Sequence, residues 1–276
     1  MKDFAGRTCV VTGAASGIGR ALALALADRG ARLALSDVDE AGVHETATAC
    51  TGRGAPARGY RVDVADRKAV HAHAEQVADD VGPAALVVNN AGVTLIAAIQ
   101  EMSYDDMRWV VDVNFWGVVH GTQAFLPQLL AAGRSGDPAH LVNISSVFGL
   151  LAVPKQSAYC ASKFAVRGFT EAVRQDLLRD DAPVAVSSVH PGGIKTAIVQ
   201  NARVAPSEEK SHLHKLFYRV ATTSAESAAA QILKGVERDR PRILVGYDAL
   251  GLDLLPRVTG SRYQRLTARL MGRAGY

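Results

Sequence analysis

Two side chains able to exchange protons, Tyr159 and Lys163, lie four residues apart in the middle of this chain. In a helix this spacing puts both on one face, about one turn apart. A free tyrosine has a pKa of about 10, which is too high for proton transfer near neutral pH. A lysine ammonium beside the phenol favours the phenolate and lowers that pKa. We therefore expect Tyr159 to act as a general acid/base with a pKa brought toward about 7.

A serine hydroxyl is expected at the edge of a sheet that could serve this pair. Ser146 follows the apolar run Leu141–Ile144, which is typical of a buried strand. Open α/β sheets bind ligands at the carboxyl ends of their strands. A Tyr-x-x-x-Lys pair also occurs by chance on exposed helices, so its catalytic interpretation depends on what the rest of the chain supplies.

A glycine-rich turn lies near the start of the chain. The β-rich run Thr8–Thr12 leads into Gly13-Ala14-Ala15-Ser16-Gly17-Ile18-Gly19, and Arg20–Arg29 then has the periodicity of a helix. A strand, a glycine-rich turn and a helix in this order favour nucleotide binding. The glycines let the backbone approach a pyrophosphate, and the N-terminus of the helix attracts its negative charge. The alternative is an ordinary turn with glycine caps.

An acidic residue follows the next expected strand. Asp37 comes directly after Arg32–Ser36. A carboxylate there can accept both hydroxyls of an adenosine ribose, and it would repel a 2′-phosphate. Neither Ala14 nor Ala15 supplies a basic side chain for such a phosphate. These features favour NAD over NADP, and the alternative is a solvated loop aspartate.

Two more expected strands end in residues that suit a nucleotide. Asp63-Val64 ends the strand Ala57–Val62, and this carboxylate could hydrogen-bond an adenine amino group. Asn89-Asn90-Ala91-Gly92 follows the strand Ala85–Val88. Small and amide residues at the end of a strand can line a nucleotide and link neighbouring strands.

Asn114 lies inside a long helical stretch, Ser103–Leu130. Asparagine is a poor residue for a helix interior. Its neighbours Val113 and Phe115 are apolar, so we expect the amide to be buried and to need hydrogen-bond partners. The alternative is a tolerated polar residue on an exposed face.

The other periodic segments continue the alternation of strands and helices. Helices are expected at Asp39–Cys50, Asp66–Val81, Tyr159–Leu178 and Ser224–Glu237, and strands at Val184–Val189 and Ile243–Val245. His71 and His73 are two residues apart, on different helix faces, so we expect both at the surface. Residues 197–221 are the least regular part and are expected to form a lid or a flexible loop.

Composition predicts a single α/β domain. The 276 residues are 48% hydrophobic and 21% charged, which is ample for one core. The three cysteines show no disulfide or metal spacing, so we expect a reducing cytoplasm and no metal. The glycine-rich turn begins too early for a secretory signal to precede it. The most apolar run, Ala84–Ile99, is interrupted by Asn89, Asn90 and Gly92, so no membrane span is expected.

The net charge of +4 is concentrated at the C-terminus. The segment from Leu250 onward holds five arginines and one acid, Asp253, an excess of four. The rest of the chain is therefore balanced. A nucleic-acid binder would need a basic surface on the folded body, so we expect no nucleic-acid partner.

Taken in order, these motifs resemble those of the short-chain dehydrogenases/reductases, and the resemblance extends to about residue 247. The motifs are Thr12-Gly13-x-x-x-Ser16-Gly17-Ile18-Gly19, Asp63-Val64, Asn89-Asn90-Ala91-Gly92, Asn114, Ser146, Tyr159-x-x-x-Lys163 and Pro191-Gly192. The resemblance implies a Rossmann-type, doubly wound sheet of seven parallel strands in the order 3-2-1-4-5-6-7. It assigns residues 1–247 to the NAD-binding domain, with a lid at 197–221 and a basic amphipathic extension at 248–276.

The resemblance also implies roles for the site residues. Tyr159 is the acid/base, Ser146 hydrogen-bonds the same substrate oxygen, and Lys163 holds the nicotinamide ribose and lowers the tyrosine pKa. Asn114 holds a water that links Lys163 to solvent, and Ile194 and Thr196 fix the carboxamide. The expected cofactor-binding set is Gly13, Ser16, Gly17, Ile18, Gly19, Asp37, Asp63, Val64, Asn90, Ala91, Gly92, Tyr159, Lys163, Pro191, Gly192, Ile194 and Thr196.

The expected reaction is hydride transfer between NAD and the carbon of a secondary alcohol or ketone. The expected pocket wall is mostly apolar, which favours a hydrophobic substrate; it comprises Val93, Leu95, Val147, Phe148, Val153, Gln156 and the lid. The alternatives are an NADP-dependent carbonyl or lipid reductase, and a non-catalytic NAD-sensing or membrane-surface protein. The family also suggests a homotetramer or homodimer built on the helices Tyr104–Leu130 and Tyr159–Leu178.

The C-terminal extension predicts an amphipathic helix over Ser261–Arg273. Four arginines at 262, 265, 269 and 273 form one stripe, and Tyr263, Leu266 and Leu270 form an adjacent apolar stripe. One interpretation is a helix docked on its own body or on a neighbouring subunit, with the arginines in water. The other is an interfacial helix that makes peripheral contact with anionic lipid.

Overall fold

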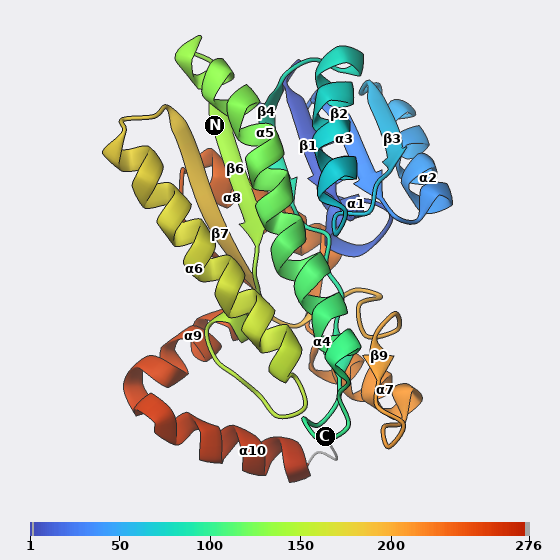
Figure 1. The fold of residues 1–276 in the computed structure, drawn as a ribbon, viewed down its shortest axis with the longest axis vertical. Coiled ribbons are helices and arrows are strands. Elements are labelled where there is room, and N and C mark those ends of the chain that lie inside the picture. The colour runs from blue at the N-terminus through green and yellow to red at the C-terminus, as the bar shows by residue number, and fades with distance from the viewer. Residues whose placement is uncertain (2, 274–276) are drawn as a thin grey trace.

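A parallel sheet of seven strands forms the centre of the computed structural model, which describes residues 1 and 3–273 (Figure 1). The strands lie in the order β3-β2-β1-β4-β6-β7-β11, and every neighbouring pair is parallel. Their bounds are β1 Thr8–Thr12, β2 Arg32–Asp37, β3 Ala57–Arg61, β4 Ala84–Asn89, β6 Ala139–Ile144, β7 Val184–Pro191 and β11 Arg242–Val245. Numbered along the chain, this is the expected order 3-2-1-4-5-6-7, which is confirmed.

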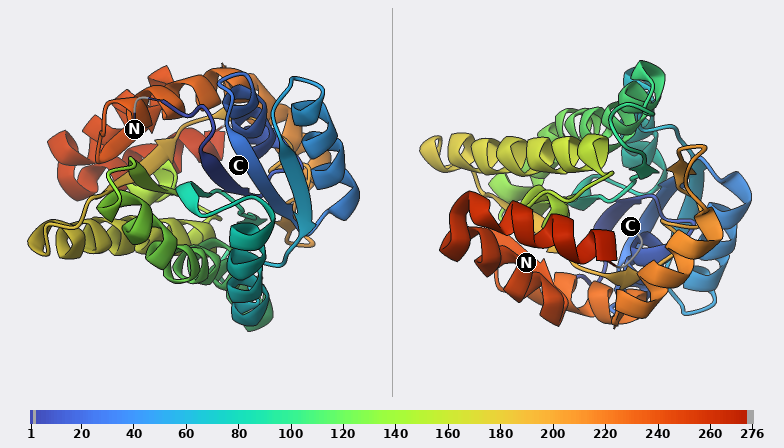
Figure 2. Two further views of the ribbon diagram at one scale, coloured as in Figure 1. Left: turned by 90° about the horizontal axis from the view of Figure 1, so that it is seen from above. Right: turned by 90° about the horizontal axis from the view of Figure 1, so that it is seen from below.

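Helices cover both faces of the sheet (Figure 2). One layer contains α1 (Gly17–Ala27), α2 (Glu40–Thr51) and α8 (Ala225–Glu237), and the other contains α3 (Arg67–Asp80), α5 (Gly117–Arg134) and α6 (Ser157–Arg179). Along β1, Cys9 and Val11 belong to the first core while Val10 belongs to the second, because successive strand side chains point to opposite faces. Burial on both faces explains the continuous apolar runs.

The stretch expected to be one helix from Ser103 to Leu130 is interrupted. It consists of α4 (Tyr104–Val111), a π-helical turn at Asp112–Trp116, and α5. Asn114 lies in the π turn and is fully buried. Two glycines let α5 approach the sheet: a Cβ on Gly117 would lie 2.7 Å from Val64 Cγ2, and one on Gly121 would overlap Asn89 Oδ1. The prediction of burial was right, and that of an uninterrupted helix was wrong because α-helical periodicity does not reveal a π turn.

The histidine pair on α3 divides between surface and core. His71 is exposed as expected, but His73 is only 3% exposed. The buried face of α3 consists of Val70, His73, Ala74 and Val77, at helical spacing. The His73 ring lies edge-on to Tyr60 and Phe125, with centroids 4.8 and 5.9 Å away. The prediction of a surface residue was wrong for His73, because the helix face containing it packs on the sheet.

The segment from 197 to 221 has more order than its composition indicates. It contains β9 (Arg203–Val204) and α7 (Lys210–Val220), and β9 pairs with β5 (Leu95–Ile96). Leu213 of α7 belongs to a small apolar cluster with Ile96 and Val199. Residues 197–221 are therefore docked on the segment that follows β4.

The C-terminal extension begins as a helix earlier than expected. It comprises α9 (Tyr247–Thr259), a short 3₁₀ turn (Gly260–Arg262) and α10 (Tyr263–Arg273). Tyr263 is buried and accepts a hydrogen bond from the Ala152 amide at 3.0 Å, while Arg262, Arg265 and Arg269 are exposed. Of the expected apolar stripe only Tyr263 is docked on the body of the chain, while Leu266 and Leu270 are 47% and 54% exposed. The side chain of Arg273 and residues 274–276 lie outside the described part of the chain. No described helix is long and apolar enough to cross a bilayer.

Candidate active site

The predicted site residues gather along one edge of the sheet. Gly13 directly follows β1, Asp37 ends β2, and Asp63-Val64 lies just past β3. Asn90 follows β4, Ser146 lies two residues past β6, and Pro191 ends β7. The order of the strands reverses between β1 and β4, and this reversal creates the crevice in which such sheets bind ligands.

The glycine-rich turn is closely packed against the end of β4. Gly13 has a φ of +67°, and a Cβ at this residue would lie 2.7 Å from Ala91 Cα. A Cβ on Gly19 would overlap the Gly13 carbonyl oxygen. Because only glycine fits at these two positions, the backbone at the N-terminus of α1 stays open to an approaching group, as a pyrophosphate cradle requires.

Thr12 and Asn90 hold the two strand ends together. Thr12 Oγ1 accepts hydrogen bonds from the amides of Asn90 and Ala91 at 2.9 and 3.0 Å. Asn90 Nδ2 donates to the carbonyls of Thr12 and Gly13 at 2.9 and 3.2 Å. The amide side chain therefore fixes the turn, and it links strands as expected.

Asp37 is fixed beside the same turn. Its Oδ2 accepts from the Ala15 amide at 2.9 Å, and its Oδ1 accepts from the Asp39 amide at 3.1 Å. The carboxylate is thus held next to Ala15, whose methyl group carries no charge. The sequence expectation of an acid at this strand end, without a basic neighbour at Ala15, matches the geometry.

The serine, tyrosine and lysine come together between β6 and α6. The Ser146 hydroxyl lies close enough to the Tyr159 phenol to lower its pKa, and Lys163 Nζ lies 5.7 Å from the centroid of the Tyr159 ring. Lys163 Nζ donates to the Ile144 carbonyl at 3.0 Å. The Phe148 ring stands edge-on to Tyr159, with centroids 6.3 Å apart. One helical turn and the end of one strand therefore assemble all three groups.

Burial controls the protonation of this cluster. Burial raises the pKa of Tyr159 to about 12, although the hydrogen bond with Ser146 lowers it. Burial also lowers the pKa of Lys163 to about 8. The expected downward shift of the tyrosine pKa is therefore not found, because the cost of desolvating the phenolate outweighs the hydrogen bond with Ser146. At neutral pH the phenol carries its proton.

The Asn114 side chain is engaged by the backbone after β4. Its Oδ1 accepts from the Val93 amide at 2.8 Å, and its Nδ2 donates to the Val93 carbonyl at 2.9 Å and to Ser162 Oγ at 3.1 Å. A Cβ on Gly92 would lie 3.2 Å from Asn114 Oδ1 and 3.4 Å from Lys163 Nζ. Asn114 therefore holds the residues around Gly92 beside the lysine, and its role toward a water stays a prediction.

The segment after β7 reaches across to the glycine-rich turn. Ile194 and Lys195 form β8 (Ile194–Lys195), which pairs with β10 (Thr223–Ser224). A Cβ on Gly17 would lie 3.3 Å from the Thr196 side chain. Thr196 is thus beside the turn that is expected to bind the pyrophosphate.

The comparisons with known proteins agree with this geometry. A sequence profile described as short chain dehydrogenase matches residues 7–206. The chain belongs to the short-chain dehydrogenase/reductase family. This family membership makes it an oxidoreductase that uses a nicotinamide cofactor.

Relatives of this protein are similar to it over nearly its whole length. It is 49% identical to the putative oxidoreductase SadH of Mycobacterium tuberculosis, over 97% of this chain and 96% of the relative. It resembles a short-chain dehydrogenase/reductase from Burkholderia phymatum in complex with NAD, with a TM-score of 0.87, 31% identity, and 96% and 97% of the two chains covered. A metagenomic short-chain oxidoreductase in complex with NADP gives a TM-score of 0.70, 25% identity, and coverage of 88% and 97%. Similar structures therefore include complexes with either cofactor.

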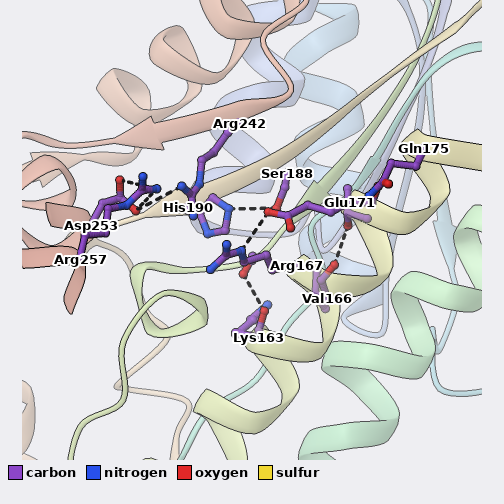
Figure 3. Close-up of polar contacts among 12 residues, drawn as sticks. Lys163, Val166, Arg167, Glu171, Gln175, Ser188, His190, Arg242, Asp253 and Arg257 are labelled. Carbon is purple, nitrogen blue, oxygen red and sulfur yellow. Dashed lines mark hydrogen bonds and ion pairs between the residues drawn. The ribbon is translucent and has the colours of Figure 1, made fainter. Parts of the chain in front are cut away.

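His190 supports the Ser146 backbone, and the sequence analysis did not identify this residue. His190 is fully buried; its Nδ1 contacts the Ser146 carbonyl at 3.0 Å and its Nε2 contacts Ser188 Oγ at 3.0 Å. Figure 3 shows His190 between Ser188 and Arg242. Burial lowers the pKa of His190 to about 4, so the ring is neutral near pH 7. Its place directly before Pro191-Gly192 was a signal that it lies at the site.

Proposed function

We propose that this protein is an NAD-dependent oxidoreductase acting on a hydrophobic secondary alcohol or ketone. The observation that carries the proposal is the cluster of Ser146, Tyr159 and Lys163 at the same sheet edge as the Gly13–Gly19 turn and Asp37. The proton donor and the cofactor cradle thus lie at one edge of the sheet, with only β4 between β6 and β1, as hydride and proton transfer to one carbonyl require.

The described residues fit a dinucleotide. The glycine-rich turn would offer its backbone to the pyrophosphate, Asp37 would bind the adenosine ribose, and Asp63 and Val64 would bind the adenine. Asn90, Ala91 and Gly92 would line the middle of the cofactor, and Tyr159 and Lys163 would hold the nicotinamide ribose. Pro191 and Gly192 would line the nicotinamide half, and Ile194 and Thr196 would fix the carboxamide. When bound, the cofactor supplies or accepts the hydride.

The chain's own groups move the proton. In reduction, Tyr159 donates its proton to the carbonyl oxygen while Ser146 holds that oxygen by a hydrogen bond. In oxidation the tyrosine accepts the proton from the alcohol. Lys163 lies against the ring of Tyr159 and at the Ile144 carbonyl, so its positive charge stabilises the phenolate formed during reduction.

The substrate side favours an apolar compound. Leu95 and Val147 are buried, and the ring of Phe148 contacts Tyr159. The one arginine that β9 contributes lies elsewhere: Arg203 stacks on Trp109, 3.8 Å from the ring centroid, and pairs with Asp106 at 3.2 Å. It is therefore occupied, and is not available to bind a substrate carboxylate or phosphate.

A panel of ketones tests the proposed function. Consumption of NADH should be greatest for apolar secondary ketones and should increase with their hydrophobic surface up to the size of the pocket. Carboxylated ketones of equal length are the matched control and should react more slowly. If no ketone consumes NADH and no alcohol reduces NAD, the enzymatic proposal is wrong and a non-catalytic NAD-binding role takes its place.

Cofactor preference should depend on Asp37. We expect the wild type to prefer NADH to NADPH, and Asp37→Ala to reduce that preference by roughly 10-fold or more, because the carboxylate repels a 2′-phosphate. The ratio of kcat/KM for the two cofactors measures it. Asp39→Ala, which removes a neighbouring carboxylate that caps α2, is the control. Equal kcat/KM values in the wild type would favour the NADP-dependent alternative.

Two apolar side chains on the α5–α6 side favour association with further copies of the chain. Trp116 is 45% exposed and Phe164 is 41% exposed. Large aromatic side chains are enriched where protein surfaces bury each other. We expect a homodimer or homotetramer, measured as a mass of two or four chains by light scattering. A monomer at micromolar concentration would contradict this expectation.

A further inference from the structure

The C-terminal segment, residues 247–273, lies at the edge of the molecule where the strands end. Figure 1 shows α9 and α10 at this edge, and the view from below shows α10 across the front (Figure 2). The family profile ends at residue 206, so this segment lies beyond the part that the profile describes. Two of its side chains, Asp248 and Tyr263, each hold the backbone of a loop that contributes to the proposed site.

Asp248, in the first turn of α9, holds the loop after β7. Its Oδ2 accepts a hydrogen bond from the Gly193 amide at 2.7 Å. A Cβ on Gly192 would overlap this carboxylate, and one on Gly246 would lie 2.5 Å from its Oδ1. The Oδ1 atom is buried and has no partner among the described residues. Gly192 and Gly246 thus leave room for the Asp248 carboxylate. Among the described residues, only its Oδ2 atom has a hydrogen-bond partner.

The loop held by Asp248 leads directly into the segment proposed to bind the nicotinamide half of the cofactor. Gly193 precedes β8, and Thr196 one residue beyond β8 contacts the Gly17 turn. The Gly192 amide also donates to the Val245 carbonyl at 2.9 Å. Asp248 therefore fixes the Gly193 end of this segment, and Thr196 at its other end lies beside the glycine-rich turn.

Tyr263, at the start of α10, holds the other loop. Its Oη accepts from the Ala152 amide at 3.0 Å, and the side chain is 9% exposed. Ala152 lies in the loop that connects the Ser146–Gly149 turn to α6, so it is on the path between Ser146 and Tyr159. The phenol of Tyr263 thus fixes the loop on the substrate side of the site.

An ion-pair cluster fixes α9 to the sheet. Asp253 of α9 pairs with Arg242 of β11 at 3.4 Å and with Arg257 at 3.1 Å (Figure 3). The Asp253 side chain is only 16% exposed. Asp253 lies between Asp248 and Tyr263 in the chain and attaches α9 to the edge strand β11. This ion pair therefore supports both the Asp248–Gly193 and the Tyr263–Ala152 hydrogen bonds.

We propose that Asp248 and Tyr263 are positioning residues, through which the C-terminal segment sets the nicotinamide-binding loop and the Ser146 loop relative to each other. This inference rests on the proposed function. Neither side chain touches the reacting atoms. Each acts through one backbone amide, Asp248 on the cofactor side and Tyr263 on the substrate side, so their effects on binding should separate.

The test of Asp248 compares two ligands that share the adenosine half. Asp248→Ala should raise the Kd of NADH about 10-fold or more, since a hydrogen bond to a charged group contributes about 1.5 kcal/mol or more. The Kd of ADP-ribose should change by less than about twofold, because this ligand lacks the nicotinamide ring and its carboxamide. Asp248→Asn keeps an acceptor for the Gly193 amide and should restore most of the NADH affinity. Asp79→Asn, at an exposed carboxylate on α3, is the control.

The test of Tyr263 expects the opposite pattern, which is weaker substrate binding with unchanged NADH binding. Tyr263→Phe removes one hydrogen bond worth about 1 kcal/mol, so the KM of the ketone should rise about fivefold while the NADH Kd stays the same. Hydrogen exchange at residues 147–153 should become faster, and this measurement needs no turnover. Tyr247→Phe, at a tyrosine that is 92% exposed, is the control.

Measurements of ligand binding and of hydrogen exchange distinguish failure of this inference from failure of the proposed function. If no ketone reacts, the split between NADH and ADP-ribose and the exchange of residues 147–153 still test both residues. Equal weakening of NADH and ADP-ribose in Asp248→Ala, or no weakening of either, overturns the role of Asp248. Unchanged exchange in Tyr263→Phe overturns the role of Tyr263.

Discussion

Replacing Tyr159 with Phe should slow turnover by at least about 100-fold and leave NADH bound. The substitution keeps the ring against Phe148 and removes only the hydroxyl that carries the transferable proton. General acid/base catalysis contributes roughly 10²–10⁴-fold, so kcat should fall by about this factor. The glycine-rich turn and Asp37 are untouched by the change, and the Kd of NADH should therefore stay within about threefold of the wild type.

Single-turnover kinetics with the best ketone from the panel measure this loss, and quenching of protein fluorescence gives the NADH Kd. Tyr104→Phe is the matched control, because Tyr104 is 91% exposed and lies at the start of α4. Its kcat should equal that of the wild type. A Tyr159→Phe variant that keeps a tenth of the wild-type kcat would remove Tyr159 from the acid/base role.

Acidification should destabilise the fold through three buried histidines. Burial lowers the pKa of His73 to about 4, of His140 to about 3 and of His190 to about 4. Each value lies below the ordinary histidine pKa of about 6.5, so the unfolded chain takes up the protons first. The stabilising contribution is complete above about pH 6.5 and is lost as the pH falls from there toward about 4 for His73 and His190 and about 3 for His140. At pH 5 each histidine should cost about 2 kcal/mol of the free energy of unfolding.

His73 allows a clean test of this linkage. Neither of its ring nitrogens has a hydrogen-bond partner among the described residues, so the neutral ring acts as an aromatic core side chain. Urea unfolding at pH 7.5 and pH 5 gives the loss for the wild type and for His73→Phe, and the variant should lose about 2 kcal/mol less. His71→Phe, at an exposed position on the same helix, should lose as much as the wild type. Identical losses in wild type and His73→Phe would show that His73 does not protonate in this range.

The sequence by itself determined the parts of the protein that depend on near neighbours. The turn from Gly13 to Gly19 and the pair Tyr159 and Lys163 each lie within a few residues of one another, so strand and helix periodicity predicts their geometry. Asp37 was placed correctly because it ends an apolar run. The motifs, taken together, also identified the family, and with it the order of the strands.

Other features required the assembled structure. The sequence places Lys163 beside Tyr159, but the pKa of the phenol depends on how much water the surrounding elements exclude, and burial raises it. The spacing of His71 and His73 predicted different helix faces and did not show which face packs on the sheet. The π turn that contains Asn114 keeps the apolar pattern of an α-helix, so only the backbone geometry reveals it.

The C-terminal segment shows most clearly what only tertiary structure decides. Its amphipathic pattern predicted a helix and left open what the apolar side covers. Asp248 meets Gly193 across 55 residues of chain, and Tyr263 meets Ala152 across 111. Periodicity and turn chemistry act over a few residues, whereas these contacts exist because β11 lies beside β7 and carries α9 to the edge where the strands end.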